Sequence, residues 1–223
     1  MDIAGYNPNS FVDYPDNIAA VVFISGCNLD CWYCHNKWII GKKAIFDKED
    51  ILSRIESNKD FLDAVEISGG EPTIADTDEL IDFIKSIKSW GLKIKLDTNG
   101  TNYAKLKKLL PYLDYVAMDI KAPLDKYHTI TKFSDNQKDN IIKAIELLID
   151  NIECEFRTTF VPSLNLEDIL KIAKTIKGCK NYYLQQYVPI EEYKERFAHP
   201  PAYLEEVCQE LKKQGYPCAI RGI

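Results

Sequence analysis

Three cysteines lie within eight positions near the start of this chain. Cys27, Cys31 and Cys34 follow an apolar run, at spacings of four and three residues. Thiolates at such spacings can converge on one centre, and they select zinc or the iron of iron–sulfur clusters. A closed site of either kind usually has four protein ligands. Three cysteines on a four-iron cluster would leave one iron open, and an open metal position is what catalysis requires.

A structural zinc site is the alternative for the same segment. His35 directly follows Cys34 and could supply the fourth ligand of a closed site. That adjacency makes binding of one ion by both side chains geometrically awkward. The total of seven cysteines is odd, which argues against a disulfide framework. The remaining cysteines are scattered and form no second site by spacing: Cys154, Cys179, Cys208 and Cys218.

Further candidate binding residues follow strand-like runs later in the chain. Gly69 and Gly70, in Ser-Gly-Gly-Glu-Pro, let the backbone approach a ligand closely. Charged groups at the carboxyl ends of barrel strands are placed as binding groups usually are. Because an unpaired charge in a lumen is costly, we expect these charges to pair with each other, a cation or the ligand. A purely structural salt-bridge network is the alternative. The candidates are Asp97, Asn99, Asp119, Lys121 and Arg157.

Alternating strands and helices must position these residues. Strands are predicted at 18–24, 64–68, 93–97, 114–120, 154–161, 181–187 and 218–221. Helices are predicted at 48–57, 76–90, 103–110, 135–149, 166–176 and 201–213. This alternation predicts a parallel sheet with right-handed crossovers. A complete barrel needs about 250 residues. We therefore expect an α/β fold of the incomplete (β/α)6 TIM-like type, with parallel strands and one open side.

The predicted strands have one apolar and one polar face. Val65 and Ile67 alternate with Glu66 and Ser68, and later strands follow the same pattern. A parallel strand covered on both faces would read as almost entirely apolar. The alternation therefore predicts a lumen that binds a polar ligand, behind a face covered by helices. An antiparallel sheet with one solvated face is the alternative.

Composition and hydropathy argue against several classes of protein. The net charge of −6 argues against duplex nucleic acid as a partner. No segment approaches the roughly 18 apolar residues of a membrane span. The first residues show no secretory signal, so we expect a cytoplasmic protein. Its 223 residues fit one domain over 1–223.

The C-x3-C-x2-C motif after the first barrel strand resembles the signature of the radical S-adenosylmethionine (SAM) superfamily. This resemblance implies one [4Fe–4S] cluster whose open iron binds the methionine amino and carboxylate groups of SAM. It places Tyr33 near the adenine, and Gly69, Gly70 and Glu71 at the methionine ammonium. Arg157 suits a bidentate grip on the methionine carboxylate. The other expected cofactor contacts are His35, Asp97, Asn99, Asp119 and Lys121.

Three shorter motifs, Cys-x-x-Cys-His-Asn, Asp-Thr-Asn-Gly and Asp-Ile-Lys, together resemble glycyl-radical-enzyme activating enzymes. The opening, at 4–6 and 10–15, is most similar to activators of anaerobic ribonucleotide reductase. Asp16 stands where those relatives often have glycine, so the loop there is expected to differ in shape. A cysteine-rich insertion found in many relatives is missing, so one cluster is expected.

The resemblance implies a reaction in three steps. Flavodoxin or ferredoxin donates an electron to the cluster. Cleavage of the S–C5′ bond of SAM then gives methionine and a 5′-deoxyadenosyl radical. That radical takes a hydrogen from a backbone glycine of the partner, expected to be an anaerobic ribonucleotide reductase. The activating enzymes also suggest a monovalent cation beside Asp97 and Asp119.

Two other functions are compatible with the sequence. A small-molecule radical enzyme, such as a 7-carboxy-7-deazaguanine synthase, has a similar length and the same core motifs. A non-enzymatic metal-binding scaffold is the second alternative. The expected open barrel favours a large partner that inserts a loop, because a small-molecule enzyme would need to close its barrel around the substrate.

Overall fold

Eight strands form one sheet, and their order in the sheet is their order in the sequence. The computed structural model describes residues 1–41 and 44–222. The strands are β1 (Ile3–Tyr14), β2 (Asn17–Ile24), β3 (Ala64–Gly69), β4 (Lys93–Thr98), β5 (Tyr115–Asp119), β6 (Cys154–Phe160), β7 (Tyr182–Gln186) and β8 (Ala219–Arg221). Strands β2 to β8 run parallel, whereas β1 pairs antiparallel with β2.

One α-helix lies between each successive pair of parallel strands. The helices are α1 (Lys48–Asn58), α2 (Thr77–Ser89), α3 (Tyr103–Leu109), α4 (Asp135–Asn151), α5 (Leu166–Thr175) and α6 (Pro201–Lys213). Short 3-10 turns occur at Lys37–Ile39, Pro72–Ile74, Leu110–Tyr112, Tyr127–Thr129 and Glu191–Tyr193. Side chains at the N-caps of α1, α2, α4 and α5 accept hydrogen bonds from the first turn, which fixes where these helices begin.

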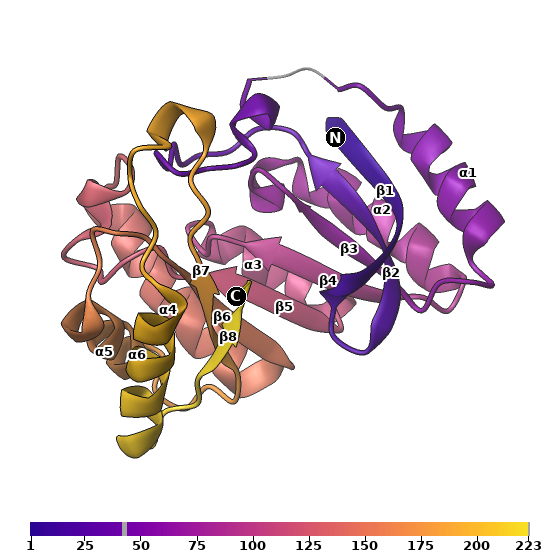
Figure 1. Ribbon diagram of the computed structural model, residues 1–223. Helices are drawn as coiled ribbons and strands as arrows, with labels where there is room; N and C mark the ends of the chain where they lie inside the picture. The colour runs from indigo at the N-terminus through magenta and orange to yellow at the C-terminus, as the bar shows by residue number, and fades with distance from the viewer. Residues whose placement is uncertain (42–43, 223) are drawn as a thin grey trace.

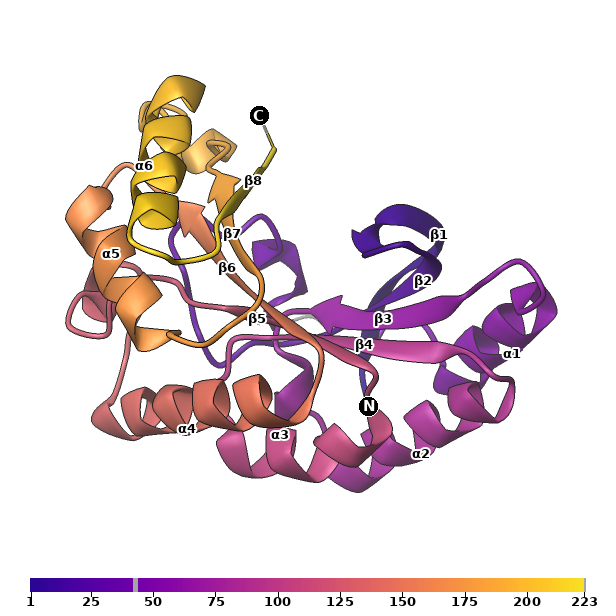
Figure 2. The same ribbon diagram turned by 90° about the horizontal axis from the view of Figure 1, so that it is seen from below.

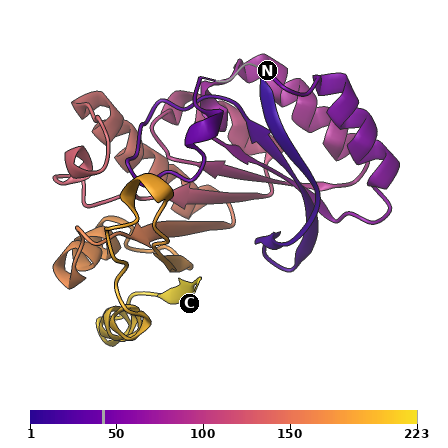
Figure 3. The same cartoon turned by 45° about the horizontal axis from the view of Figure 1, so that its top comes forward.

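The sheet curves but does not close. Figure 2 shows the helices along its outer face. Strands β1 and β8 are the two edges of the sheet, and Figure 3 shows the β1–β2 hairpin and β8 facing each other across the open side. The expected incomplete, laterally open α/β barrel is confirmed. No helix in the part of the chain that the structure describes is long and apolar enough to cross a membrane.

Strand β1 was not predicted from the sequence. Its glycine, proline and asparagine residues weaken the strand pattern. The register shifts of β1 against β2 show that the pairing is irregular. Asp16, in the turn between the two strands, has a φ of 58°. Aspartate tolerates this left-handed conformation better than most residues, which lets it stand where glycine would be favoured.

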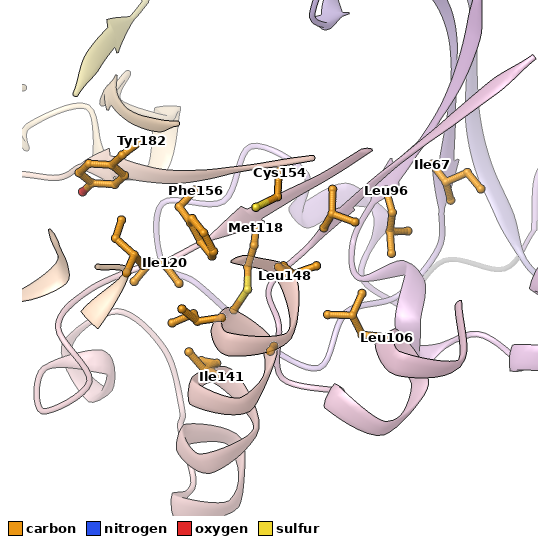
Figure 4. Packing of buried hydrophobic residues seen from close by; sticks show 14 of the residues in the cluster. Ile67, Leu96, Leu106, Met118, Ile120, Ile141, Leu148, Cys154, Phe156 and Tyr182 are labelled. Atoms are coloured by element: carbon orange, nitrogen blue, oxygen red, sulfur yellow. The ribbon is translucent and has the colours of Figure 1, made fainter. Parts of the chain in front are cut away.

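The apolar faces of the strands pack against the helices, as predicted. Figure 4 shows Ile67, Leu96 and Met118 pointing from the sheet toward the helical layer, where Leu106 of α3 and Leu148 of α4 meet them. All five side chains are buried completely or almost so. The polar residues that alternate with them therefore face the other side of the sheet.

Candidate active site

A cavity of about 610 Å³ lies at the carboxyl ends of the parallel strands. Its volume is within the usual range for small-molecule sites. Of the site residues predicted from the sequence, Glu71 is the one that does not line it. The others do: Cys27, Cys31, Tyr33, Cys34, His35, Gly69, Gly70, Asp97, Asn99, Asp119, Lys121 and Arg157.

The cysteine loop, residues 27–34, is anchored to the segment that follows β5. Trp32 N donates to Ile130 O at 3.2 Å, and Asp30 N donates to Thr131 Oγ1 at 2.9 Å. These bonds satisfy backbone groups of the loop without using its thiols. The loop is therefore fixed from outside, which leaves the sulfur atoms available for ligands.

The three thiols of the loop are free and line the cavity. Cys31 is buried, while Cys27 and Cys34 are half-buried. Burial raises the pKa of Cys27 to about 11 and also raises the pKa of Cys31. Since the thiolate is the form that binds metal, loading a metal centre here must release protons.

The two glycines at the end of β3, Gly69 and Gly70, pack against the backbone that leads into the cysteine loop. A Cβ atom on Gly70 would lie 1.8 Å from Gly26 O, and Gly69 has a φ of 114°. Gly70 N donates to Ile24 O at 3.0 Å, and Glu71 N donates to Gly26 O at 2.9 Å. The glycines line the cavity as expected, but the close approach that requires them is to the backbone of the chain itself.

Glu71 lies behind the cavity wall and joins two loops. Its fully buried carboxylate accepts hydrogen bonds from Thr73 N, from Thr98 Oγ1 at 2.8 Å and from Asn99 N at 2.6 Å. Burial raises the pKa of Glu71, and these hydrogen bonds counteract the effect. Glu71 thus fixes the loop after β3 to the loop after β4.

Asn99 continues this connection to the cysteine loop. Its Nδ2 donates to Asn28 Oδ1 at 3.0 Å and lies 4.0 Å from Cys27 Sγ. Its Oδ1 accepts from Thr101 Oγ1 at 2.6 Å, which fixes the orientation of the amide. Asn99 therefore positions the start of the cysteine loop from the loop that follows β4.

Charged residues also line the cavity, and Arg157 is at their centre. Its Nε donates to Asp119 Oδ1 at 2.8 Å, and its Nη2 donates to Asp97 Oδ2 at 2.9 Å. Lys121 Nζ donates to Asp119 Oδ2 at 2.8 Å. The predicted pairing of these charges is confirmed, and Arg157 bridges the two aspartates.

Two further cationic side chains, Lys95 and Arg221, extend this cluster. Lys95 Nζ lies 2.7 Å from Glu66 Oε2 and 2.6 Å from Asp97 Oδ1. Arg221 binds both oxygens of Glu155, at 2.6 and 2.8 Å. The eight charged residues are called the charged wall: Glu66, Lys95, Asp97, Asp119, Lys121, Glu155, Arg157 and Arg221.

The charged wall holds its aspartates ionised. Burial raises the pKa of Asp119, but the charges of Arg157 and Lys121 outweigh burial and hold the pKa well below 3.8. Asp97 is affected in the same direction by Arg157 and Lys95. The two aspartates are therefore held in preformed ion pairs at neutral pH.

Aromatic side chains close the cavity beside the cysteine loop. Tyr33 is buried, and its hydroxyl has no hydrogen-bond partner among the described residues. Its ring lies edge-on to Trp32 and Tyr187, with centroids 5.3 and 6.4 Å away. His35 Nε2 lies 3.0 Å from Val188 O. These contacts bring the segment after β2 beside the segment after β7 (Figure 1).

Sequence reasoning did not name Glu66, Lys95 or Glu155 as site residues. The signal for them was the alternation of polar and apolar residues, which placed them on the lumen face. What could not be read from the sequence was that Lys95 reaches Asp97 on the same strand and Glu66 on the next one.

Comparison with known proteins gave both a family and close relatives. The profile of the Radical SAM superfamily matches residues 21–176. MJ1227 of Methanocaldococcus jannaschii, provisionally named a glycyl-radical enzyme activating enzyme, is 39% identical over 219 residues, which cover 95% of this chain and 90% of MJ1227. The pyruvate formate-lyase-activating enzyme of Clostridium pasteurianum is 33% identical, over 80% of this chain and 77% of that enzyme.

Solved structures share the fold at low sequence identity. SuiB of Streptococcus suis, in a structure with bound S-adenosylmethionine, superimposes with a TM-score of 0.69 at 15% identity. The superposition covers 88% of this chain, which spans about half of SuiB, 48%. The likeness extends over most of the open barrel described above.

Proposed function

The chain belongs to the radical SAM superfamily and, within it, to the glycyl-radical enzyme activating enzymes, and on this premise we propose that it installs a glycyl radical on a partner enzyme. One observation carries the proposal: the three thiols and the charged wall contribute to the same cavity of about 610 Å³. A cluster on one side and the polar groups of SAM on the other would meet there.

We propose that Cys27, Cys31 and Cys34 hold one [4Fe–4S] cluster. Within the described residues, no three His, Cys, Asp or Glu side chains lie close enough together to bind a single metal ion. A cluster instead distributes its cysteine ligands over separate irons. When bound, the cluster would supply the electron that cleaves the S–C5′ bond of SAM.

Lys121 and Arg157 are the proposed ligands of the methionine carboxylate. Lys121 uses one hydrogen bond on Asp119, and an ammonium has three donors. Arg157 Nη1 has a 3.8 Å contact with Glu155, while Nε and Nη2 are engaged by the two aspartates. A bidentate grip would require Arg157 to release an aspartate, whereas a single bond through Nη1 would not. These remaining donors support the assignment.

The other proposed contacts concern the amino group and the adenine. Gly69 O accepts one hydrogen bond, from Asn36 Nδ2 at 3.2 Å, and a carbonyl oxygen has a second lone pair for the methionine ammonium. Tyr33 offers an apolar ring next to the cysteine loop for the adenine. We assign Glu71 an indirect role, holding the glycines in place, since its carboxylate is saturated by the protein.

The proposed substrate is the glycine loop of a partner enzyme, most specifically an anaerobic ribonucleotide reductase. The sheet edges β1 and β8 are unpaired with each other, which supports entry of a loop from the open side. We further propose that flavodoxin or ferredoxin is the electron donor, and that residues 1–223 act as one domain in the cytoplasm.

An anaerobic assay with two readouts tests this function. Reconstituted protein, dithionite and SAM should yield 5′-deoxyadenosine, and addition of an anaerobic ribonucleotide reductase should give a doublet glycyl-radical signal by electron paramagnetic resonance. Pyruvate formate-lyase serves as a second glycyl radical enzyme. If neither enzyme gains the signal, yet a pterin-like small molecule accelerates 5′-deoxyadenosine formation, the 7-carboxy-7-deazaguanine synthase function is favoured instead.

A further inference from the structure

Lys95 occupies an unusual place for a lysine. Its side chain is 1% exposed and belongs to the buried part of the charged wall. Its Nζ donates to Asp97 Oδ1 at 2.6 Å and to Glu66 Oε2 at 2.7 Å. Burial lowers the pKa of Lys95, but the charges of Asp97 and Glu66 outweigh burial and raise it above 10.5. Lys95 is therefore a buried ammonium ion held between two carboxylates.

The charged wall leaves no aspartate oxygen without a cation. Asp97 Oδ1 meets Lys95, and Asp97 Oδ2 meets Arg157. Asp119 Oδ1 meets Arg157, and Asp119 Oδ2 meets Lys121. All four distances are between 2.6 and 2.9 Å. A metal cation beside these aspartates would have to share oxygens that already bind cationic nitrogens of the chain, and it would be repelled by those charges.

With all of its carboxyl groups ionised, the charges of the wall also balance. It contains four carboxylates, from Glu66, Asp97, Asp119 and Glu155, and four cationic side chains that contact them. Desolvating a metal ion is costly and is repaid only by uncompensated negative charge. Burial and the charge of Asp97 raise the pKa of Glu66 to about 8. Any protonation of Glu66 would add positive charge and disfavour a metal ion further.

We propose that Lys95 is a resident cation, which takes the place that a monovalent metal ion would occupy beside Asp97, so that SAM binding needs no added metal cation. The expected cation beside Asp97 and Asp119 does not fit this donor set. The statement about SAM rests on the proposed function. The statement about the site concerns the folded protein alone and can be tested without SAM.

Thermal unfolding of the cluster-free protein tests the site directly. Midpoints are compared at equal ionic strength in tetramethylammonium, sodium and potassium chloride. A metal site half-filled at about 1 mM would raise the midpoint in 100 mM cation by at least about 5 °C. We expect the three wild-type midpoints to agree within about 1 °C. A rise specific to sodium or potassium would overturn the proposal.

Removing the ammonium of Lys95 should make the unfolding midpoint depend on sodium or potassium, which we do not expect for the wild type. Lys95→Ala leaves Glu66 and Asp97 facing an emptied space, so its midpoint should fall in tetramethylammonium and recover partly in sodium or potassium. Lys95→Gln keeps the volume without the charge and serves where Lys95→Ala does not fold. Lys88→Gln, in the half-exposed pair with Asp114, is the matched control and should not respond. If both Lys95 variants ignore the cation, the proposal is wrong.

A measurement of SAM binding distinguishes failure of this proposal from failure of the proposed function on which it rests. Equilibrium dialysis of reconstituted wild-type protein with labelled SAM should give dissociation constants within twofold in the three salts. Affinity at least fivefold higher in sodium or potassium would contradict a resident cation. If SAM does not bind in any salt, the proposed function fails, while the unfolding midpoints still decide the role of Lys95.

Discussion

The cavity has two walls, the charged wall and the cysteine loop, and they differ in whether the chain itself supplies partners for their polar groups. In the charged wall, each carboxylate has a cation of the chain within hydrogen-bond distance, as the Arg157 bridge shows. In the cysteine loop, Cys27 Sγ accepts long hydrogen bonds from Leu29 N at 3.4 Å and from Asn99 Nδ2 at 4.0 Å. The charged wall is complete without a ligand, whereas the thiols gain strong partners only when something binds.

This difference separates stability from function within one site. Breaking the charged wall should leave buried charge uncompensated, so the cost should appear in folding. Breaking the cysteine loop should leave the fold intact and remove the metal centre. Substitutions in one wall should therefore change stability or ligand binding without changing the other property.

The largest expected effect is loss of the cluster on substitution of a thiol. Cys31→Ala removes one of the three proposed ligands, so anaerobic reconstitution should give almost none of the approximately four irons and four sulfides expected per wild-type chain. Iron and sulfide analysis with the visible absorption spectrum measures this.

Cys154→Ala is the matched control, because Cys154 is a buried thiol at the start of β6, outside the cavity. It should reconstitute like the wild type. Stoichiometric zinc without sulfide in anaerobically purified wild-type protein would contradict the cluster assignment and favour the closed zinc site.

The second prediction attacks the centre of the charged wall. Arg157→Met leaves Asp97 and Asp119 side by side without their bridge. Removing one partner from a buried ion pair typically costs about 3–5 kcal/mol, and urea unfolding should show a loss of that order. Lys171→Ala breaks the exposed pair with Asp125 and should change stability far less, because solvent screens an exposed ion pair. Equal losses in the two variants would show that the charged wall is not a buried network.

The outline of both walls could be predicted from the sequence, because it follows from local rules. The spacing of Cys27, Cys31 and Cys34 and the alternation of polar residues along the strands do not depend on tertiary detail. The roles of Gly70 and Glu71 could not be read in this way. Both residues contact backbone from other segments, Gly26 and Asn99, and only the fold brings those atoms together. The same applies to β1, whose strand conformation depends on pairing with β2.

The third prediction uses pH to act on each wall separately. The pKa of Asp119 is lowered in the folded state, so its contribution to stability is present above about pH 3.8 and is lost as the pH falls below that value. The pKa of Cys27 is raised from 9.0 to about 11, so its contribution is present below pH 9 and is lost as the pH rises toward 11. Urea unfolding of cluster-free protein from pH 3 to 10.5 should show both losses.

Two variants test which residue causes the loss of stability at acid pH and which causes the loss at alkaline pH. Asp119→Asn should reduce the loss of stability at acid pH, to which Asp97 also contributes, and Cys27→Ala should reduce the loss at alkaline pH, to which other buried thiols also contribute. If Cys27→Ala keeps the full alkaline loss, burial of that thiol does not contribute to it, and the two walls do not differ in the way described.

The smallest expected effect concerns Lys121, which belongs to the charged wall but still has donors available for a ligand. Lys121 Nζ is bound to Asp119 but has two donors left, and its side chain is 18% exposed, so water can reach the space that a truncation leaves. Lys121→Ala should therefore fold normally, yet bind SAM about tenfold more weakly, because a hydrogen bond to a charged group is worth about 1.5 kcal/mol. Equilibrium dialysis with reconstituted protein measures the change.

Lys126→Ala, whose partner Asp168 lies outside the cavity, should bind SAM like the wild type. If Lys121→Ala instead loses stability as Arg157→Met does while its SAM affinity is unchanged, Lys121 belongs wholly to the self-contained wall and the ligand is held by other groups.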